Sequence, residues 1–199
     1  MSNFIEGMKL KKLKGGSSMK IALVIGHRKS SQGAYGSMGI SEYSFYKEFV
    51  MELLDYLIDD NYIKVFERKD KGSGYSERMR DLHRRIDHWG ADISISFHFN
   101  GSSKQEVNGH EILYCSKKGK RIALRLDEKL DQYLPNNDRN IKKRTSKQRG
   151  GGFLCRGKST CILIEPFFAS HQSLYVRSGE ERQNLISAIS EFINELSLT

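Results

Sequence analysis

Short apolar runs alternate with longer amphipathic stretches along most of this chain. The short runs are typical of buried strands, and they cover residues 20–26, 62–66, 93–97, 111–115 and 161–164. Between them, apolar residues recur three or four positions apart, as on one face of a helix, over residues 45–57, 79–89, 122–130 and 185–196. Strands that alternate with helices predict an α/β fold, with a mostly parallel central sheet flanked by helices on both faces.

The chain is long enough for one folded domain, because 199 residues can bury a sizeable core. Residues 1–18 end in Gly-Gly-Ser-Ser, and we interpret them as a flexible leader or a remnant of cloning, which leaves a domain of residues 19–199. Residues 136–152 are polar, basic and rich in glycine, so they are predicted to form a long loop.

No apolar run approaches the length of a membrane span, and no apolar segment typical of a signal peptide follows the first lysines. We therefore expect a monomer without a membrane span, made in the cytoplasm without a signal peptide. The three cysteines, Cys115, Cys155 and Cys161, are an odd number without the spacing of a metal site. They are predicted to be buried, reduced thiols.

The chain carries a formal charge of +9. A basic surface favours polyanions, such as nucleic acid, an anionic membrane or an anionic cell-wall polymer, and the charge does not choose among them. The densest basic patch consists of Arg139, Lys142, Lys143, Arg144, Lys147 and Arg149. It lacks interleaved aromatic residues on which bases would stack, so nucleic acid is not expected as a partner.

Polar residues gather where the predicted strands end. His27 directly follows the first strand and His98 ends the third, while Glu42 begins the first helix, just after the loop that follows His27. In a parallel sheet, ligands bind beyond the carboxyl ends of the strands, so these side chains are expected to meet at one rim. Two imidazoles and a carboxylate form a catalytic type of zinc site, which leaves a position open for water. The sequence therefore predicts that His27, Glu42 and His98 bind Zn²⁺.

Glu165 ends the late apolar strand at the same rim. Unpaired carboxylates are rarely buried, so a glutamate there needs a cation, a partner or a chemical task. We predict that it is the catalytic general base of a metal-assisted hydrolysis. The alternative is a salt bridge to Arg156 or Lys158. Glu42 has a structural alternative as well, because the helix dipole favours a carboxylate in the first turn.

The other histidines carry weaker signals. His83 and His88 lie among charged residues of one predicted helix and are expected on its solvated face. His110 and His171 each flank a strand and remain candidates for the site.

Several segments, in this order and spacing, resemble the zinc-dependent N-acetylmuramoyl-L-alanine amidases of the type 3 class. The matching segments are residues 26–27, 32–36, 39–43, 68–70, 91–100, 109–112 and 161–170, and the similarity runs from about Lys20 to the C-terminus. This resemblance implies that zinc is bound by His27, Glu42 and His98 and that Glu165 is catalytic. Val24 stands where the family usually has an acidic residue, a departure that would loosen the orientation of His27.

The resemblance implies a substrate, peptidoglycan, cut at the amide between N-acetylmuramic acid and the L-alanine of the stem peptide. Asn100 is predicted to contact this substrate, and Arg156 and Lys158 to hold its carboxylates.

A basic catalytic domain with neither a wall-binding module nor a signal peptide fits a phage or prophage endolysin. Such a lysin would be released through a holin and act on the cell wall or in the periplasm. The alternatives are a host amidase of wall remodelling or spores, a zinc carboxypeptidase acting on stem peptides, and a non-catalytic basic module that binds nucleic acid or wall polymer.

Overall fold

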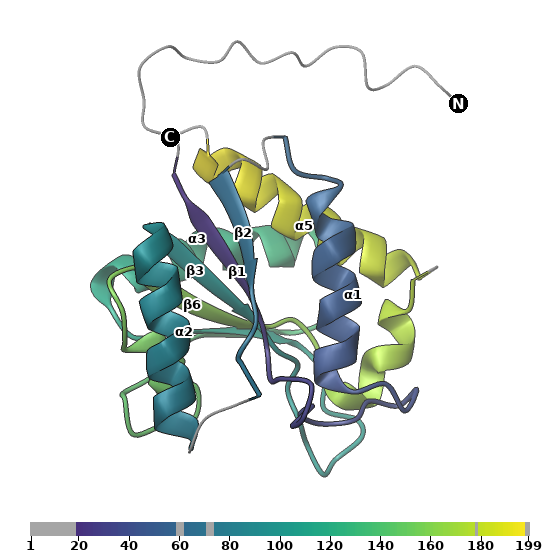
Figure 1. The fold of residues 1–199 in the computed structure, drawn as a ribbon. Coiled ribbons are helices and arrows are strands. Elements are labelled where there is room, and N and C mark those ends of the chain that lie inside the picture. Colours follow the sequence, from purple (N-terminus) through teal and green to yellow (C-terminus); the bar gives the residue numbers. More distant parts are fainter. Residues whose placement is uncertain (1–18, 59–61, 71–73, 178, 198–199) are drawn as a thin grey trace.

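A computed structural model describes residues 19–58, 62–70, 74–177 and 179–197. The interpretation of residues 1–18 as a leader lies outside these described residues. The α/β architecture predicted from the alternating pattern is confirmed, as Figure 1 shows.

Six strands form one sheet in the order β2-β1-β3-β6-β4-β5. Their bounds are β1 (Ile21–Ile25), β2 (Ile63–Phe66), β3 (Ile93–Phe97), β4 (His110–Tyr114), β5 (Asp138–Lys143) and β6 (Thr160–Glu165). The pairs β2-β1, β1-β3 and β3-β6 are parallel. Strand β4 runs antiparallel to β6, and β5 runs parallel to β4. Because of this reversal, the start of β4 lies beside the end of β6.

Helices cover both faces of the sheet. The larger core lies between one face and the helices α1 (Glu42–Leu54), α3 (Lys117–Tyr133) and α5 (Glu180–Ser197). A smaller core lies between the other face and the helices α2 (Tyr75–Trp89) and α4 (Gly151–Leu154). Figure 1 shows α2 on one side of the sheet and α1 with α5 on the other. A 3₁₀ helix, η2 (Ala169–Tyr175), follows β6.

Strand β3 illustrates how the sequence divides its side chains between the two cores. Ile93, Ile95 and Phe97 face the larger core, whereas Ser94 and Ser96 point to the other face, as the alternation of a strand requires. Helix α1 begins where expected, because the Ser41 side chain caps it by accepting a hydrogen bond from the Ser44 amide at 3.1 Å.

The prediction of one long loop over residues 136–152 is wrong, because this stretch contains β5 and the start of α4. Strand β5 lies at the edge of the sheet, where charged side chains are tolerated and no alternating apolar pattern is required. Its pairing with β4 therefore leaves no signal in the hydrophobicity of the sequence.

The prediction of three reduced thiols is wrong for two of them. Cys115 and Cys155 form a disulfide, because the segment after β4 and the end of α4 meet with a Cα–Cα distance of 5.5 Å, within the range that a disulfide spans. Cys161 is a buried free thiol, as predicted, and burial raises its pKa to about 11.

None of the helices among the described residues is long and apolar enough to cross a membrane.

Packing of α3 against the sheet can be tested with two leucines of that helix. Leu126 is fully buried in the larger core, whereas Leu124 is 42% exposed. Leu126→Ala should lower the free energy of unfolding by about 2–5 kcal/mol, since it leaves a cavity. Leu124→Ala should change it by less than about 0.5 kcal/mol. Denaturant unfolding measures both, and equal losses would contradict this packing.

Candidate metal centre and active site

The structure brings His27, Glu42 and His98 together at the predicted rim. The Glu42 carboxylate lies between the two imidazoles: Oε2 is 3.1 Å from His27 Nε2, and Oε1 is 2.6 Å from His98 Nδ1. One ligand atom from each residue lies within 4.8 Å of the others. The two rings meet edge to face, with their centroids 5.1 Å apart.

Two glycines make room for this cluster. A Cβ atom on Gly26 would lie 2.2 Å from the Phe97 carbonyl oxygen and 2.8 Å from the His98 ring. Gly33 has a φ of +81°, and a Cβ there would lie 2.6 Å from the His27 ring and 2.8 Å from Glu42 Oε2. Any larger residue at either position would displace a candidate ligand.

Backbone strain also positions His27, which has a φ of +63°, in the left-handed region that L residues rarely adopt. The Arg68 side chain donates a hydrogen bond to the His27 carbonyl oxygen at 3.1 Å, and Tyr46 donates one to the His98 carbonyl oxygen at 2.6 Å. Such strain is typical of functional sites, where surrounding contacts hold the residue in place.

Glu42 is a buried carboxylate that stays ionised. Burial raises its pKa, but hydrogen bonds from His27 and His98 outweigh that effect and lower the pKa to about 2. The backbone amides of Ala34 and Phe99 also donate to it, at 3.4 Å and 3.3 Å. Burial lowers the pKa of His98 against the opposing effect of Glu42, which favours the neutral imidazole that binds metal ions.

Glu165 ends β6 and is 4% exposed. Burial raises its pKa to about 7; Arg149 opposes this shift, and the neighbouring Glu111 adds to it. Its cationic partner is Arg149, whose Nη2 lies 3.3 Å from Glu165 Oε1. The alternative of a salt bridge to Arg156 or Lys158 is therefore wrong, because the basic stretch before α4 supplies the partner instead.

Glu111 lies directly opposite Glu165 in the antiparallel register of β4 and β6. Its Oε2 is 2.5 Å from Lys142 Nζ and 3.0 Å from Arg139 Nε. Burial raises the pKa of Glu111, but these two cations lower it overall. The two facing carboxylates thus differ: Glu111 is held as an anion, while Glu165 can take up a proton near neutral pH.

Sequence analysis did not identify Glu111 or Arg149 as parts of the site. Glu111 did carry a signal, because it is a carboxylate inside an apolar strand, as Glu165 is. Arg149 carried none, since it was one of six cations in a basic patch.

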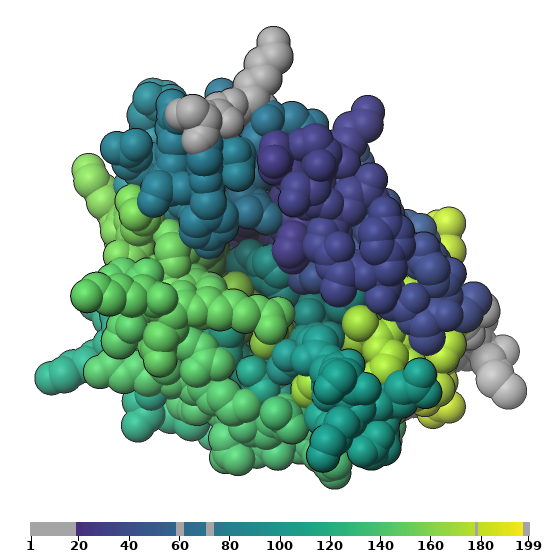
Figure 2. Space-filling view, turned by 90° about the horizontal axis from the view of Figure 1, so that it is seen from below, coloured from purple at the N-terminus to yellow at the C-terminus, as the bar shows by residue number. Residues whose placement is uncertain are grey.

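A cavity of about 450 Å³ joins the candidate metal ligands to Glu165. His27, His98, Arg149, Arg156 and Glu165 are among its lining residues. Figure 2 shows this part of the surface hollowed between the purple and blue segments on one side and the green segment on the other. A substrate in this cavity can contact both the candidate metal ligands and Glu165.

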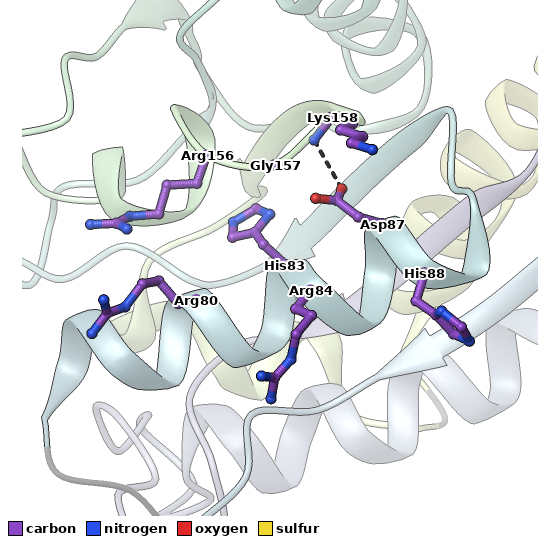
Figure 3. Close-up of a pocket in the computed structure, with 8 residues that line it drawn as sticks. All are labelled: Arg80, His83, Arg84, Asp87, His88, Arg156, Gly157 and Lys158. Carbon is purple, nitrogen blue, oxygen red and sulfur yellow. Dashed lines mark hydrogen bonds between the residues drawn. The ribbon is translucent and has the colours of Figure 1, made fainter.

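The three residues predicted to contact substrate lie in different places. Asn100 lines a neighbouring hollow of about 510 Å³ that also reaches Glu165. Arg156 lines the main cavity and also a hollow of about 530 Å³ along α2. Lys158 lines the hollow along α2, as Figure 3 shows, and it is not among the residues that line the cavity containing Glu165.

The remaining histidines are distributed over the fold. His88 is exposed on α2, as predicted, but His83 is 4% exposed and packs against the Phe153 ring, so its prediction as a solvated residue is wrong. Its ring points inward toward Gly157 in Figure 3. His110 is fully buried on the face of the sheet opposite the cavity. His171 lies in η2 beside Ser170.

A family model described as N-acetylmuramoyl-L-alanine amidase matches residues 21–195. No curated protein matches the chain. Among solved structures, the catalytic domain of the CD27L endolysin targeting Clostridia difficile is 27% identical, with a TM-score of 0.68, over 90% of this chain and 97% of that one. An N-acetylmuramoyl-L-alanine amidase from Clostridium difficile 630 is 18% identical, with a TM-score of 0.74, over 90% and 97%. The CwlV catalytic domain from Bacillus (Paenibacillus) polymyxa var. colistinus is 18% identical, with a TM-score of 0.72, over 89% and 97%.

The raised pKa of Glu165 predicts a pH-dependent cost to stability. The folded state binds this proton more tightly than the unfolded chain, whose glutamates titrate near 4.5, so stability falls as the pH rises from about 4.5 to about 7. Glu165→Gln cannot ionise and should gain thermal stability relative to the native protein at pH 8, but not at pH 4. Thermal unfolding with chelator present measures this difference. Glu106→Gln, at an exposed position, is the control and should show the same difference at both pH values.

Proposed function

The chain belongs to the N-acetylmuramoyl-L-alanine amidase family and acts on peptidoglycan; on this premise we propose that His27, Glu42 and His98 hold a catalytic zinc ion and that Glu165 is the general base. One observation carries the proposal. Two imidazoles and an ionised carboxylate converge on one wall of a cavity, and a buried carboxylate with a pKa of about 7 lines the same cavity.

The donor set supports a zinc ion. Glu42 is buried between two imidazoles, an arrangement that costs free energy unless a cation or proton balances the carboxylate. Two nitrogens and one oxygen are typical of catalytic zinc sites. The chemistry that such an ion supplies is Lewis acidity, which polarises an amide carbonyl and lowers the pKa of a water molecule.

Glu165 would move the proton. As a carboxylate, it would accept a proton from the water that attacks the scissile carbonyl, and it would then donate that proton to the nitrogen of the leaving L-alanine. A pKa of about 7 suits both steps, because the group ionises readily and can still give the proton back. Arg149 would keep the pKa from rising further, while Glu111, held by Arg139 and Lys142, would keep it from falling.

Cations and amides around the cavity would position the substrate. Arg156 lines the cavity, and Asn100 lines the adjoining hollow that reaches Glu165. We infer that Arg156 holds a carboxylate of the stem peptide and that Asn100 hydrogen-bonds to the peptide or the sugar.

The role in the cell is proposed from similarity. The endolysin domain, at 27% identity, favours a bacteriolytic enzyme released through a holin over a host amidase of wall remodelling. An assay of turbidity loss with intact cells and with isolated sacculi tests this role. The host amidase would be favoured if the protein lyses isolated sacculi but does not lyse cells, even cells whose outer layers have been permeabilised.

Metal dependence is tested by removing the metal and by replacing one of its proposed ligands, His98. Removal of metal by chelator should abolish amide hydrolysis, and added Zn²⁺ should restore it. His98→Ala should lose the catalytic ion and the activity together, because it removes one of the three protein ligands of that ion. His88→Ala is the control, since His88 is exposed on α2. Full activity of metal-free protein would rule out the zinc mechanism.

The role of Glu165 is tested by Glu165→Gln. The variant should retain zinc and the fold but lose turnover by about 10²-fold or more, the scale of a general base. Metal analysis and the rate on a soluble muramyl peptide measure both properties. If zinc is lost with the activity, Glu165 is a ligand and the proposed role is wrong.

The bond that is cut is tested by mass spectrometry of digested peptidoglycan. Free stem peptides that begin with L-alanine are expected. Release of a C-terminal amino acid would instead support the carboxypeptidase alternative, and binding without any product would support the basic binding module.

A further inference from the structure

A second cluster of ionisable side chains lies on the face of the sheet opposite the active-site cavity. His110 begins β4, and Asp138, its register partner, begins β5. Asp127 and Asp131 lie one turn apart on α3, which packs over the same strands. Three elements thus bring four such residues together, although they are scattered along the sequence.

The ring of His110 is oriented by Asn136. The Asn136 amide group donates to the Pro166 carbonyl oxygen at 2.7 Å, which assigns its oxygen to the other side, 2.8 Å from His110 Nδ1. An amide oxygen can only accept, so His110 Nδ1 carries a proton. In the neutral ring, Nε2 then has a free lone pair.

Three carboxylates lie close to this nitrogen. His110 Nε2 lies 3.3 Å from an oxygen of Asp131, 3.7 Å from one of Asp138 and 3.9 Å from one of Asp127. The His110 side chain is fully buried, and neither its Nε2 nor the Asp127 Oδ1 makes a hydrogen bond. Buried polar atoms without partners are rare and require a specific explanation.

His110 balances the negative charge of these carboxylates only if its ring is protonated. Among the ion pairs of the described residues, no lysine or arginine pairs with Asp127, Asp131 or Asp138. Like charges one helical turn apart destabilise a helix, so a cation beside Asp127 and Asp131 would stabilise α3.

The distances suit a bound metal ion. Zn²⁺ lies about 2.0–2.1 Å from nitrogen and oxygen ligands, which places tetrahedral ligands roughly 3.3–3.4 Å apart. The separations from His110 Nε2 to Asp131 and Asp138, 3.3 Å and 3.7 Å, are close to this value. One ligand atom from each of these three residues lies within 4.8 Å of the others. Asp131 and Asp138 are partly exposed, at 50% and 34% of their side chains, so an ion can enter from solvent.

We propose that His110, Asp131 and Asp138 form a second metal site, with Asp127 beside it, which binds a divalent transition-metal ion such as Zn²⁺. The imidazole favours this class over Mg²⁺ and Ca²⁺, which prefer oxygen ligands alone. The ion would join the first residues of β4 and β5 to α3. It would thereby hold the start of β4 in place. The residue after His110 on β4 is Glu111, which lies opposite Glu165 of the neighbouring strand β6.

The test counts ions bound per chain. Metal-free protein is equilibrated with Zn²⁺, passed through a desalting column and analysed for metal. The native protein should hold two ions and Asp131→Asn one. His98→Ala should keep the ion at the second site, and His98→Ala with Asp131→Asn should hold none. Asp131 is half-exposed on a helix surface, so its replacement by asparagine should leave the fold intact, which circular dichroism checks.

Glu128→Gln is the matched control. Glu128 is exposed on α3 next to Asp127, so its replacement removes the same charge outside the cluster. It should keep both ions. Zinc should also raise the melting temperature of His98→Ala, and Asp131→Asn in that background should abolish the rise. The proposal is overturned if His98→Ala binds no zinc, if Asp131→Asn leaves the second ion in place, or if Glu128→Gln loses it equally. These results do not depend on amidase activity, so they stand apart from the test of the catalytic ion.

Discussion

A single buried carboxylate, Glu42, connects the parts of the molecule on which the active site depends. Its two oxygens face His27, which follows β1, and His98, which follows β3, while it begins α1 itself. Two adjacent strands and the helix that covers them are therefore fixed relative to one another at the point where chemistry would occur. Because the carboxylate is buried and ionised, any movement of either imidazole would expose it to an unbalanced environment.

The reversal of β4 sets the chemistry of the second half of the site. In a fully parallel sheet, the residue beside Glu165 would come from the carboxyl end of another strand. Here the start of β4 lies there instead and places Glu111 opposite Glu165. Two carboxylates side by side cannot both ionise freely, and the cations of β5 decide which one does. The edge strand, which adds little to the core, thus influences the protonation of Glu165, the proposed general base.

The parts that the sequence predicts are those fixed by apolar patterning and by strand ends. Apolar runs and stripes predict every strand except β5 and the four long helices. The rule that ligands bind beyond strand ends places His27, His98 and Glu165 at one rim. The parts that it misses depend on contacts between distant segments. Strand β5 is charged and is defined by its pairing with β4. Arg149 lies against Glu165 only because the fold brings the segment before α4 to the end of β6. Likewise, no spacing rule brings Cys115 and Cys155 together across 40 residues.

The exposure of Arg149 has a consequence for how enzymes with this site can diverge. Its side chain is 69% exposed and belongs to neither core, yet it is the cation that lies against Glu165. A substitution at this position would change the pH at which the proposed general base works, while it would leave the proposed metal ligands and the packing untouched. Enzymes of organisms in acidic or alkaline surroundings could thus adapt by one substitution at this exposed position. Such a change would avoid the loss of stability that follows from changes inside a catalytic centre.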